Sequence, residues 1–420
     1  SKQMQPAAPR TVILVFHADR GHFNVCIPLI ANLRDLGFKC ELWTNGVSSS
    51  WIEEDAVDTI RCLCRGDDFL KVSSDYKRLS AHGECDEDGR KYFEENWPHP
   101  AEFEADSKVT AADRTAFHDR LTLSKDVCAV VSESLATWAS DIAATCALPI
   151  LTLLPTCLFL FREKKQHVSG PWGTTVTVGF IVAECLREDL PSLSGGIMYL
   201  NAFKPISGEF MKDESLKVWL DGTDLEEEQR QVTLITLGSQ SVLRSLSPWA
   251  ENLLISGALQ ASKRVLIAGA GSGDELEQGP DESMQAALSE GRLMRTGYIE
   301  QWPVLGHENV KCVVSHCGAN STHEILMRGK PIVPLPFFDD QYYIADALRD
   351  RIFKYKCAPL TKALFRDEGR QAEAIEAVSS AVCEGLSVDR KLLGELKDGI
   401  SKEDGARQAA TLVQTMALSS

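Results

Sequence analysis

The sequence predicts an α/β protein made of two doubly wound domains, and three observations support this prediction. Short apolar runs rich in β-branched residues recur along the chain, as is typical of buried parallel strands. Helical patterns separate these runs, so strands and helices alternate. The runs form two series joined by a Glu-rich stretch, and a length of 420 residues is sufficient for more than one domain core.

The first series begins close to the start of the chain. Thr11–Ala18 (TVILVFHA) is the first predicted strand, a Gly-His turn and a helical pattern follow it, and Lys39–Asn45 (KCELWTN) is the next strand. This order defines a βαβ unit. The theme repeats with the strands Cys128–Ser134 and Pro149–Pro155 and a helix through Asp141–Thr145 between them.

The second series contains further predicted strands. They are Val232–Leu237, Lys263–Ala268, Leu293–Thr296, Lys311–Ser315 and Pro331–Leu335. A linker is expected near residues 205–230, where the Glu-rich stretch Leu216–Gln231 has the composition of a solvated segment. The sequence therefore predicts an N-terminal domain over residues 1–215, a C-terminal domain over 216–405 and a closing helix over 406–420.

Composition limits the functions that the chain can have. Hydrophobic residues make up 44% and charged residues 25%, which excludes a disordered chain, a collagen-like fibre and a coiled coil. A formal net charge of −16 is unsuited to non-specific binding of nucleic acid. We find no apolar run of the roughly 18 residues that span a membrane, no signal-peptide pattern, and scattered cysteines typical of reduced thiols. We therefore expect a cytoplasmic protein with no stable membrane insertion.

A short polar turn follows the predicted strand Lys311–Ser315. It reads His316-Cys317-Gly318-Ala319-Asn320-Ser321-Thr322. A turn of this kind exposes backbone N–H groups at the start of a helix, where a phosphate or pyrophosphate binds well. Glu324 lies three residues after Ser321, which predicts a capping box. On this segment alone, a helix start without any ligand explains the turn equally well.

The residues around this turn resemble the signature segment of the family-1 glycosyltransferases, which bind UDP-sugars. The matching residues, at ungapped spacing, are Gln301, Leu305, His307, His316, Cys317, Gly318, Asn320, Ser321, Thr322, Glu324, Gly329, Pro331, Pro336, Asp340 and Gln341. The resemblance implies the GT-B fold, in which two Rossmann-like domains face each other across a cleft. It also implies that the closing helix packs back on the N-terminal domain.

The resemblance assigns the donor contacts position by position. Tyr298 would stack on the uracil in place of the family's usual Trp, and the backbone at Ile299 and Gln301 would contact the base edge. The pyrophosphate would be held by His316, Gly318, Asn320, Ser321 and Ser239, the last of which lies in a Gly-Ser turn after the strand Val232–Leu237. Glu324 would accept the ribose hydroxyls, and Asp340 and Gln341 would contact the sugar. Ala319 departs from the Trp of many plant members.

The resemblance extends to the catalytic groups of the N-terminal domain. Gly21-His22-Phe23-Asn24 resembles the family's Gly-His turn, whose histidine is the general base. Such a base needs a carboxylate that fixes its tautomer and stabilises the imidazolium. The family places an Asp at the end of a later strand, and this chain has Glu133 there, with Ser132 as the alternative partner. Each residue also has a structural interpretation that involves no catalysis: His22 would be a polar residue at the start of a helix, and Glu133 would be a carboxylate in a loop.

These assignments imply an inverting hexosyltransferase that moves a sugar from a UDP-sugar to a hydroxyl of a small, lipophilic acceptor. Gln341 predicts glucose, because Gln at this position accompanies glucose donors in the family. The backbone amides and His316 would stabilise the leaving UDP, so neither a metal nor another cofactor is expected. A non-catalytic nucleotide-sugar-binding subunit and a UDP-sugar epimerase or hydrolase on the same scaffold remain as alternatives.

Several other segments carry weaker signals. Gly269–Asp274 superficially resembles a dinucleotide fingerprint, but its glycine spacing is wrong and we expect a loop. Glu84–Glu95 nearly fits a calcium loop, except that its first ligand is Glu and Lys91 occupies an apolar position. Cys312 with His316 and Cys317 matches no standard zinc spacing. The polar, acidic stretch Asp67–Arg114 predicts an elaboration with one or two short helices.

Overall fold

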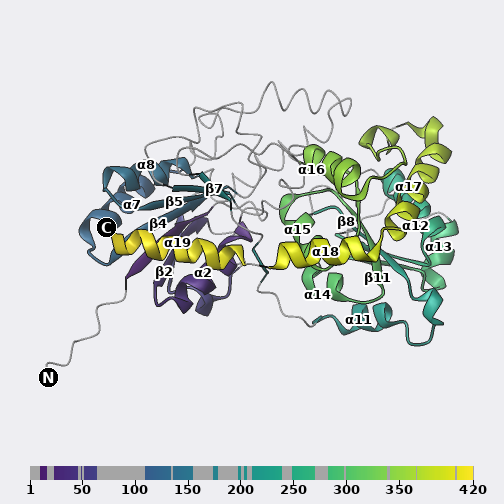
Figure 1. Ribbon diagram of the computed structural model, residues 1–420, viewed down its shortest axis with the longest axis horizontal. Coiled ribbons are helices and arrows are strands. Elements are labelled where there is room, and N and C mark those ends of the chain that lie inside the picture. Colours follow the sequence, from purple (N-terminus) through teal and green to yellow (C-terminus); the bar gives the residue numbers. More distant parts are fainter. Residues whose placement is uncertain are drawn as a thin grey trace.

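The protein consists of two α/β units that lie side by side, as the computed structural model in Figure 1 shows. The structure describes residues 10–16, 23–45, 49, 52–63, 109–133, 136–154, 174–177, 197–199, 203–205, 211–238, 248–269, 282–297, 299–337, 341–365, 367–402 and 404–419. The fold class is the one that the sequence predicts: two doubly wound domains, each built on a parallel sheet.

The N-terminal domain is built on a parallel seven-stranded sheet with the order β3-β2-β1-β4-β5-β6-β7. Its strands are β1 (Thr11–Val15), β2 (Lys39–Asn45), β3 (Thr59–Leu63), β4 (Val127–Glu133), β5 (Ile150–Leu154), β6 (Thr174–Thr177) and β7 (Ile197–Tyr199). Sequence analysis misses β3 because Arg61 and Cys62 are exposed, so this edge strand lacks an apolar run. It misses β6 and β7 because strands of four and three residues carry little pattern.

Helices cover both faces of this sheet. They are α2 (Cys26–Asp35), α7 (Ala111–Leu123) and α8 (Thr137–Thr145), with a 3₁₀ turn, η1 (Glu54–Ala56). One apolar core lies between the sheet and α2, and a second lies between the sheet and the pair α7 and α8. Because both faces are covered, the central strands are buried along their whole length, which explains their continuous apolar sequences.

The C-terminal domain repeats this plan with a parallel five-stranded sheet of order β10-β9-β8-β11-β12. Its strands are β8 (Val232–Thr236), β9 (Arg264–Ala268), β10 (Leu293–Thr296), β11 (Val310–Ser315) and β12 (Ile332–Pro334). All five lie within one residue of their predicted positions at each end. The sheet's two apolar cores again lie on opposite faces.

The helices of this domain segregate between the two faces. The described helices are α11 (Glu214–Asp221), α12 (Pro248–Ala261), α13 (Glu282–Ser289), α14 (Gln301–Gly306), α15 (Ala319–Met327), α16 (Gln341–Ala347), α17 (Gln371–Leu386) and α18 (Arg390–Ser401). Shorter turns are η2 (Glu227–Gln229), the π-helical η5 (Leu348–Phe353), η6 (Lys362–Phe365) and η7 (Glu368–Arg370). Helices α12, α13 and α17 cover one face, and α11, α14, α15, α16 and α18 cover the other.

Part of the expected linker is a helix that packs on the C-terminal domain. Helix α11 begins at the N-cap Asp213, whose carboxylate accepts from the backbone N–H groups of Ser215 and Leu216. Leu216 and Leu220, four residues apart, are buried in the C-terminal core. The Glu-rich composition of the segment conceals this apolar pair, so the prediction of a solvated stretch is wrong for α11.

Two residues of the C-terminal domain fix the end of α11. His307 Nδ1 accepts from the backbone N–H of Asn309, so its Nε2 carries the proton and donates to Asp221 Oδ1 at 3.0 Å. Asn309 Nδ2 donates to the Leu220 carbonyl at 2.9 Å. His307 therefore holds the chain that enters the domain.

The end of the chain returns to the first domain, as Figure 1 shows for the yellow helices. Helix α18 packs against α15, and α19 (Gly405–Ser419) packs against α2 and β4. Ala406, Ala409, Ala410 and Val413 are buried in the N-terminal core. The last helix thus belongs structurally to the domain at the other end of the sequence.

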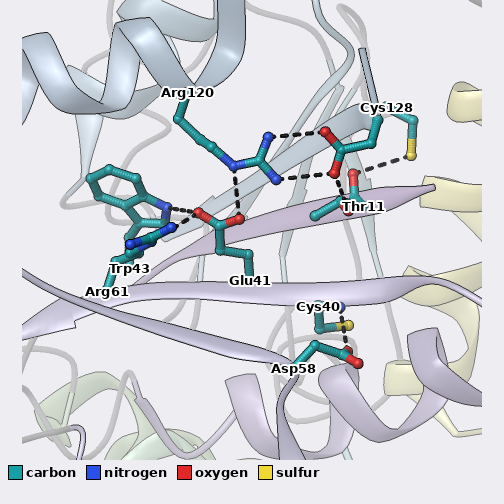
Figure 2. Close-up of polar contacts among 9 residues, drawn as sticks. Thr11, Cys40, Glu41, Trp43, Asp58, Arg61, Arg120 and Cys128 are labelled. Carbon is teal, nitrogen blue, oxygen red and sulfur yellow. Dashed lines mark hydrogen bonds and ion pairs between the residues drawn. The ribbon is translucent and has the colours of Figure 1, made fainter. Parts of the chain in front are cut away.

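A partly buried polar network attaches α7 to strands β1 and β2 of the N-terminal sheet (Figure 2). Arg120 of α7 donates from Nε to Glu41 Oε2 at 2.9 Å and makes two bonds of 3.1 Å to the Asp126 carboxylate. Thr11 Oγ1 donates to the same carboxylate, and Trp43 Nε1 donates to Glu41. Sequence analysis misses α7 because its buried residues form only a narrow stripe, although the helix begins with a full capping box of Thr110 and Asp113.

Other predicted features are placed in part. The calcium-like segment Glu84–Glu95 lies outside the described residues, as does most of the acidic elaboration. Gly269 follows β9 with a φ of +86°, and residues 270–281 beyond it lie outside the described part. Among the helices that the structure describes, none is long and apolar enough to cross a bilayer.

The Asp126 network predicts an acid-sensitive contribution to stability. Hydrogen bonds from Arg120 and Thr11 lower the pKa of Asp126 from 3.8 to about 2. A depressed folded-state pKa adds stability that is present above pH 4 and is lost as the pH falls toward 2. We expect Asp126→Asn to lower the free energy of unfolding at pH 7 by about 1 kcal/mol, since the half-exposed carboxylate is partly screened by solvent.

Denaturant unfolding at pH 7 and at pH 2.5 measures this difference. The gap between wild type and Asp126→Asn should shrink at the lower pH, where the wild-type carboxyl takes up a proton. Asp119→Asn is the matched control, because Asp119 is an exposed carboxylate of α7 outside the network. A gap that does not change with pH contradicts the assignment.

Candidate functional site

The candidate residues gather at equivalent places in the two sheets. In each sheet the strand order reverses between the first strand and the fourth, which are β1 and β4 in one domain and β8 and β11 in the other. The connections from such a pair leave toward opposite sides, and the carboxyl ends of the two strands open a crevice that binds ligands in doubly wound proteins. The turn with His316 follows β11, and Glu133 ends β4.

His316 lies between two glycine turns at the reversal point of the C-terminal sheet. A Cβ atom added to Gly238, after β8, would lie 2.6 Å from His316 Nε2, and one added to Gly318 would lie 2.5 Å from the same atom. Gly238 also has a φ of +84°, which favours glycine. The two glycines are therefore required for the imidazole to occupy this place, and His316 is 8% exposed.

A strained residue shapes the turn after β11. Cys317 has a φ of +64°, which is uncommon for a residue with a side chain, and its N–H donates to Ser315 Oγ at 3.2 Å. The bend lets α15 begin at once, at Ala319. Backbone strain of this kind concentrates at functional sites.

Helix α15 begins without a side-chain cap. Its N-cap is Gly318, which has no side chain to accept from the first N–H groups, so the predicted capping box of Ser321 and Glu324 is wrong. The helix begins earlier than that box requires, and Ser321 lies in its first turn. Gly318, Asn320 and Ser321 are partly exposed at this positive end, which is suited to an anion.

A chain of hydrogen bonds connects the end of β8 to α15. Thr236 Oγ1 donates to Gln301 Oε1 at 3.0 Å, and Gln301 Nε2 donates to Glu324 Oε2 at 2.8 Å. Burial raises the pKa of Glu324 from 4.5 to about 7, against the lowering effect of the Gln301 bond. The Gln301 side chain thus positions a carboxylate whose charge changes near neutral pH. Sequence analysis did not single out Thr236, whose only signal is a hydroxyl at the end of an apolar strand.

Gln341 is the first residue of α16 and is 3% exposed. Its Oε1 accepts from the Phe337 N–H at 2.9 Å, and the Asp339-Asp340 pair lies between these two residues in the sequence. Ile299 is buried at the start of α14. His22, Ser239, Tyr298 and Asp340 lie outside the described residues.

Glu133 lies at the reversal point of the N-terminal sheet. It is fully buried, and the pairing of Val15 with Ser132 places it beside the residue at which β1 ends. Its charge contributes to the raised pKa of Cys26, the first residue of α2, after burial and Cys40. Alternation along β4 places Glu133 on the same face of the sheet as Val131, the face that α2 covers.

Ser132 lies on the other face of the sheet. Its Oγ is 2.7 Å from Ser140 Oγ of α8, and both hydroxyls are buried. Alternation along β4 separates the two side chains, since Val131 packs on the side of α2 and Val130 on the side of α8. His22 lies outside the described residues, so Ser132 stays the alternative partner in the prediction.

The structure does not support a zinc site at Cys312, His316 and Cys317. Burial raises the pKa of Cys312 to about 12, which favours the protonated thiol over the thiolate that binds zinc. Among the described residues, no group of three His, Cys, Asp or Glu side chains is placed to hold a metal.

Part of the chain is similar in sequence to known UDP-sugar transferases. Residues 281–355 match the family model described as UDP-glucoronosyl and UDP-glucosyl transferase. A gallate 1-beta-glucosyltransferase of Quercus robur is 30% identical over 44% of this chain and 37% of its own length, and one of Punica granatum is 26% identical over 50% and 45%. The matched part of the chain thus spans less than half of these relatives. The family match confirms the resemblance to the family-1 glycosyltransferases.

Solved structures match along the whole chain. A UDP-glucosyltransferase from Polygonum tinctorium has a TM-score of 0.66 at 17% identity, covering 99% of this chain and 100% of that one. Medicago truncatula UGT71G1, solved with UDP-glucose, has a TM-score of 0.65 at 13% identity, covering 97% and 98%. At these identities the likeness establishes the two-domain fold.

The glycine contacts of His316 predict how the site responds to a single methyl group. We expect Gly318→Ala to displace the imidazole and to weaken UDP binding by at least about tenfold, the equivalent of roughly one hydrogen bond to a charged group. Gly238→Ala should weaken binding as well and also destabilise the fold through its positive φ.

The matched control is Gly291→Ala. Gly291 has a φ of +68°, but a Cβ there would meet nothing within 4 Å. This variant should lose stability and keep UDP affinity, as calorimetric titration and thermal unfolding will show. Normal UDP binding by Gly318→Ala contradicts the role given to the His316 contact.

Proposed function

We propose that the protein is an inverting glycosyltransferase that moves glucose from UDP-glucose to a hydroxyl of a small, lipophilic acceptor. The observation that carries this proposal is the position of His316 between Gly238 and Gly318, beside the uncapped start of α15 and the Gln301–Glu324 pair. These groups lie within or next to the segment that matches the UDP-sugar transferase family. The names of the similar proteins include glucosyltransferases, which supports glucose as the donor sugar.

Different residues of the C-terminal domain would bind different parts of the UDP-glucose. Tyr298 and the backbone near Ile299 would hold the uracil, and the Glu324 carboxylate would accept the ribose hydroxyls. The first N–H groups of α15, together with His316 and Ser239, would stabilise the charge that develops on UDP as it leaves. Asp340 and Gln341 would orient the glucose.

The N-terminal domain would supply the base. His22 would take the proton of the acceptor hydroxyl while the oxygen attacks the anomeric carbon, and the bond to UDP would break with inversion. Glu133, on the sheet face that α2 covers, would fix the tautomer of His22 and stabilise its protonated form. No metal is required in this scheme, because hydrogen-bond donors neutralise the leaving diphosphate.

The function is tested by incubating the protein with UDP-glucose and a panel of phenols, sterols and other alcohols, in EDTA, with detection by mass spectrometry. We expect a hexose adduct on at least one acceptor and a β-linkage by NMR. Preference for UDP-galactose, or activity only after magnesium or manganese is added, contradicts the donor and metal parts of the proposal. An epimerised or hydrolysed donor in the absence of any adduct favours the alternatives.

Glu324 predicts a pH dependence of nucleoside binding. The ionised carboxylate accepts ribose hydroxyls, and its pKa near 7 means that protonation competes with binding in the neutral range. Affinity for uridine should therefore fall about tenfold between pH 8 and pH 6. Glu324→Gln should remove this dependence, and so should 2′,3′-dideoxyuridine as ligand. Unaltered pH dependence in the Gln variant contradicts the assignment.

Glu133 predicts a defect in turnover alone. Glu133→Gln keeps the shape and removes the charge, so kcat should fall by about 10²–10⁴ while UDP affinity is preserved, since the residue lies in the other domain. His22→Ala should show the same separation, and Glu133→Asp should retain more activity than Gln. A Gln variant with near-normal kcat and pH profile shows that another group is the partner of His22.

A further inference from the structure

The backbone of Phe337, near the end of β12, is held at both its N–H and its carbonyl. The N–H of Phe337 donates to Gln341 Oε1 at 2.9 Å. Its carbonyl accepts from Tyr342 Oη at 3.0 Å and from Lys362 Nζ at 2.9 Å. All four residues are at most 5% exposed. Three side chains from two parts of the chain therefore fix the backbone of Phe337 within the core.

The hydrogen bond to Phe337 determines the orientation of the Gln341 amide, that is, the positions of its oxygen and its nitrogen. A backbone N–H can only donate, so the side-chain atom that faces Phe337 is the oxygen. The amide nitrogen then lies at the other end of the group. Gln341 would therefore act toward a ligand as a hydrogen-bond donor, and a sugar hydroxyl would serve as the acceptor.

Lys362 strengthens this arrangement from outside the matched segment. It lies on η6, beyond residues 281–355, and its neighbours Leu364 and Phe365 are anchored in the apolar core. Its ammonium is 5.9 Å from the centroid of the Tyr342 ring. A charged donor makes a stronger hydrogen bond to the Phe337 carbonyl than a neutral one, so it anchors the residue whose N–H is bonded to Gln341.

We propose that Lys362 is a positioning residue for the sugar of the donor. It acts through the backbone of Phe337 to hold Gln341 in its donating orientation. The proposal rests on the proposed function, because it assumes that Gln341 contacts the sugar. It adds a residue and a direction. The Lys362 ammonium holds the Phe337 carbonyl, and the Phe337 N–H holds the Gln341 amide oxygen. The Gln341 amide nitrogen would then donate to the sugar.

The test compares two ligands that differ only by the sugar. Calorimetric titration of the full chain gives the Kd for UDP and for UDP-glucose. Lys362→Met should weaken UDP-glucose by about tenfold and change UDP by less than about twofold, since the groups for uridine lie elsewhere. Lys362→Arg should restore part of the loss. Tyr342→Phe, which removes the other donor to the same carbonyl, should show a smaller loss of the same kind.

Lys330→Met is the control for loss of a lysine that holds backbone carbonyls. Lys330 Nζ donates to the carbonyls of His307 and Val310 at 3.0 and 2.7 Å, away from Gln341. This variant should bind both ligands as the wild type does.

An equal loss for both ligands, or no loss, in Lys362→Met and Tyr342→Phe overturns the proposal. If Lys362→Met does not fold, Tyr342→Phe and Lys362→Arg decide it by the same ratio of affinities. A wild type that binds neither ligand refutes the proposed function itself, which is a different result from a wild type that binds both.

Discussion

The reversal of strand order at one point in each sheet is the constraint on which the rest of the structure depends. In a parallel sheet the crossover connections from β1 and β4, or from β8 and β11, leave on opposite sides, so the carboxyl ends of these pairs stay open. His316 and Gly238 lie at one opening and Glu133 at the other. Buried apolar strands hold these polar groups in place, because the sheets are covered on both faces.

The C-terminal segment links the two helices that matter most to the site. Helix α18 packs against α15, which begins without a side-chain cap, and α19 packs against α2, which covers the sheet face of Glu133. At the other end of the C-terminal domain, His307 and Asn309 fix the incoming helix α11. Chain segments that enter and leave the second domain are thus both anchored by specific contacts, and His307 has a structural use.

Local sequence was sufficient to predict what depends on local chemistry. The strands β2 and β10 were predicted to the residue. The edge strand β3 was not, since Arg61 and Cys62 are exposed, and α11 was hidden by its glutamates. Resemblance, not periodicity, identified the site residues. Neither periodicity nor resemblance could identify Lys362, because its role depends on a contact with Phe337 that only the folded chain creates.

The central claim is that the opening between β8 and β11 holds a diphosphate, with His316 as one of its donors. The most direct measurement is the affinity of wild type and His316→Ala for UDP and for uridine. Loss of a hydrogen bond to a charged group predicts that the variant binds UDP about 10–100-fold more weakly and binds uridine as the wild type does. Equal losses for UDP and uridine, or unchanged UDP binding, would contradict the account.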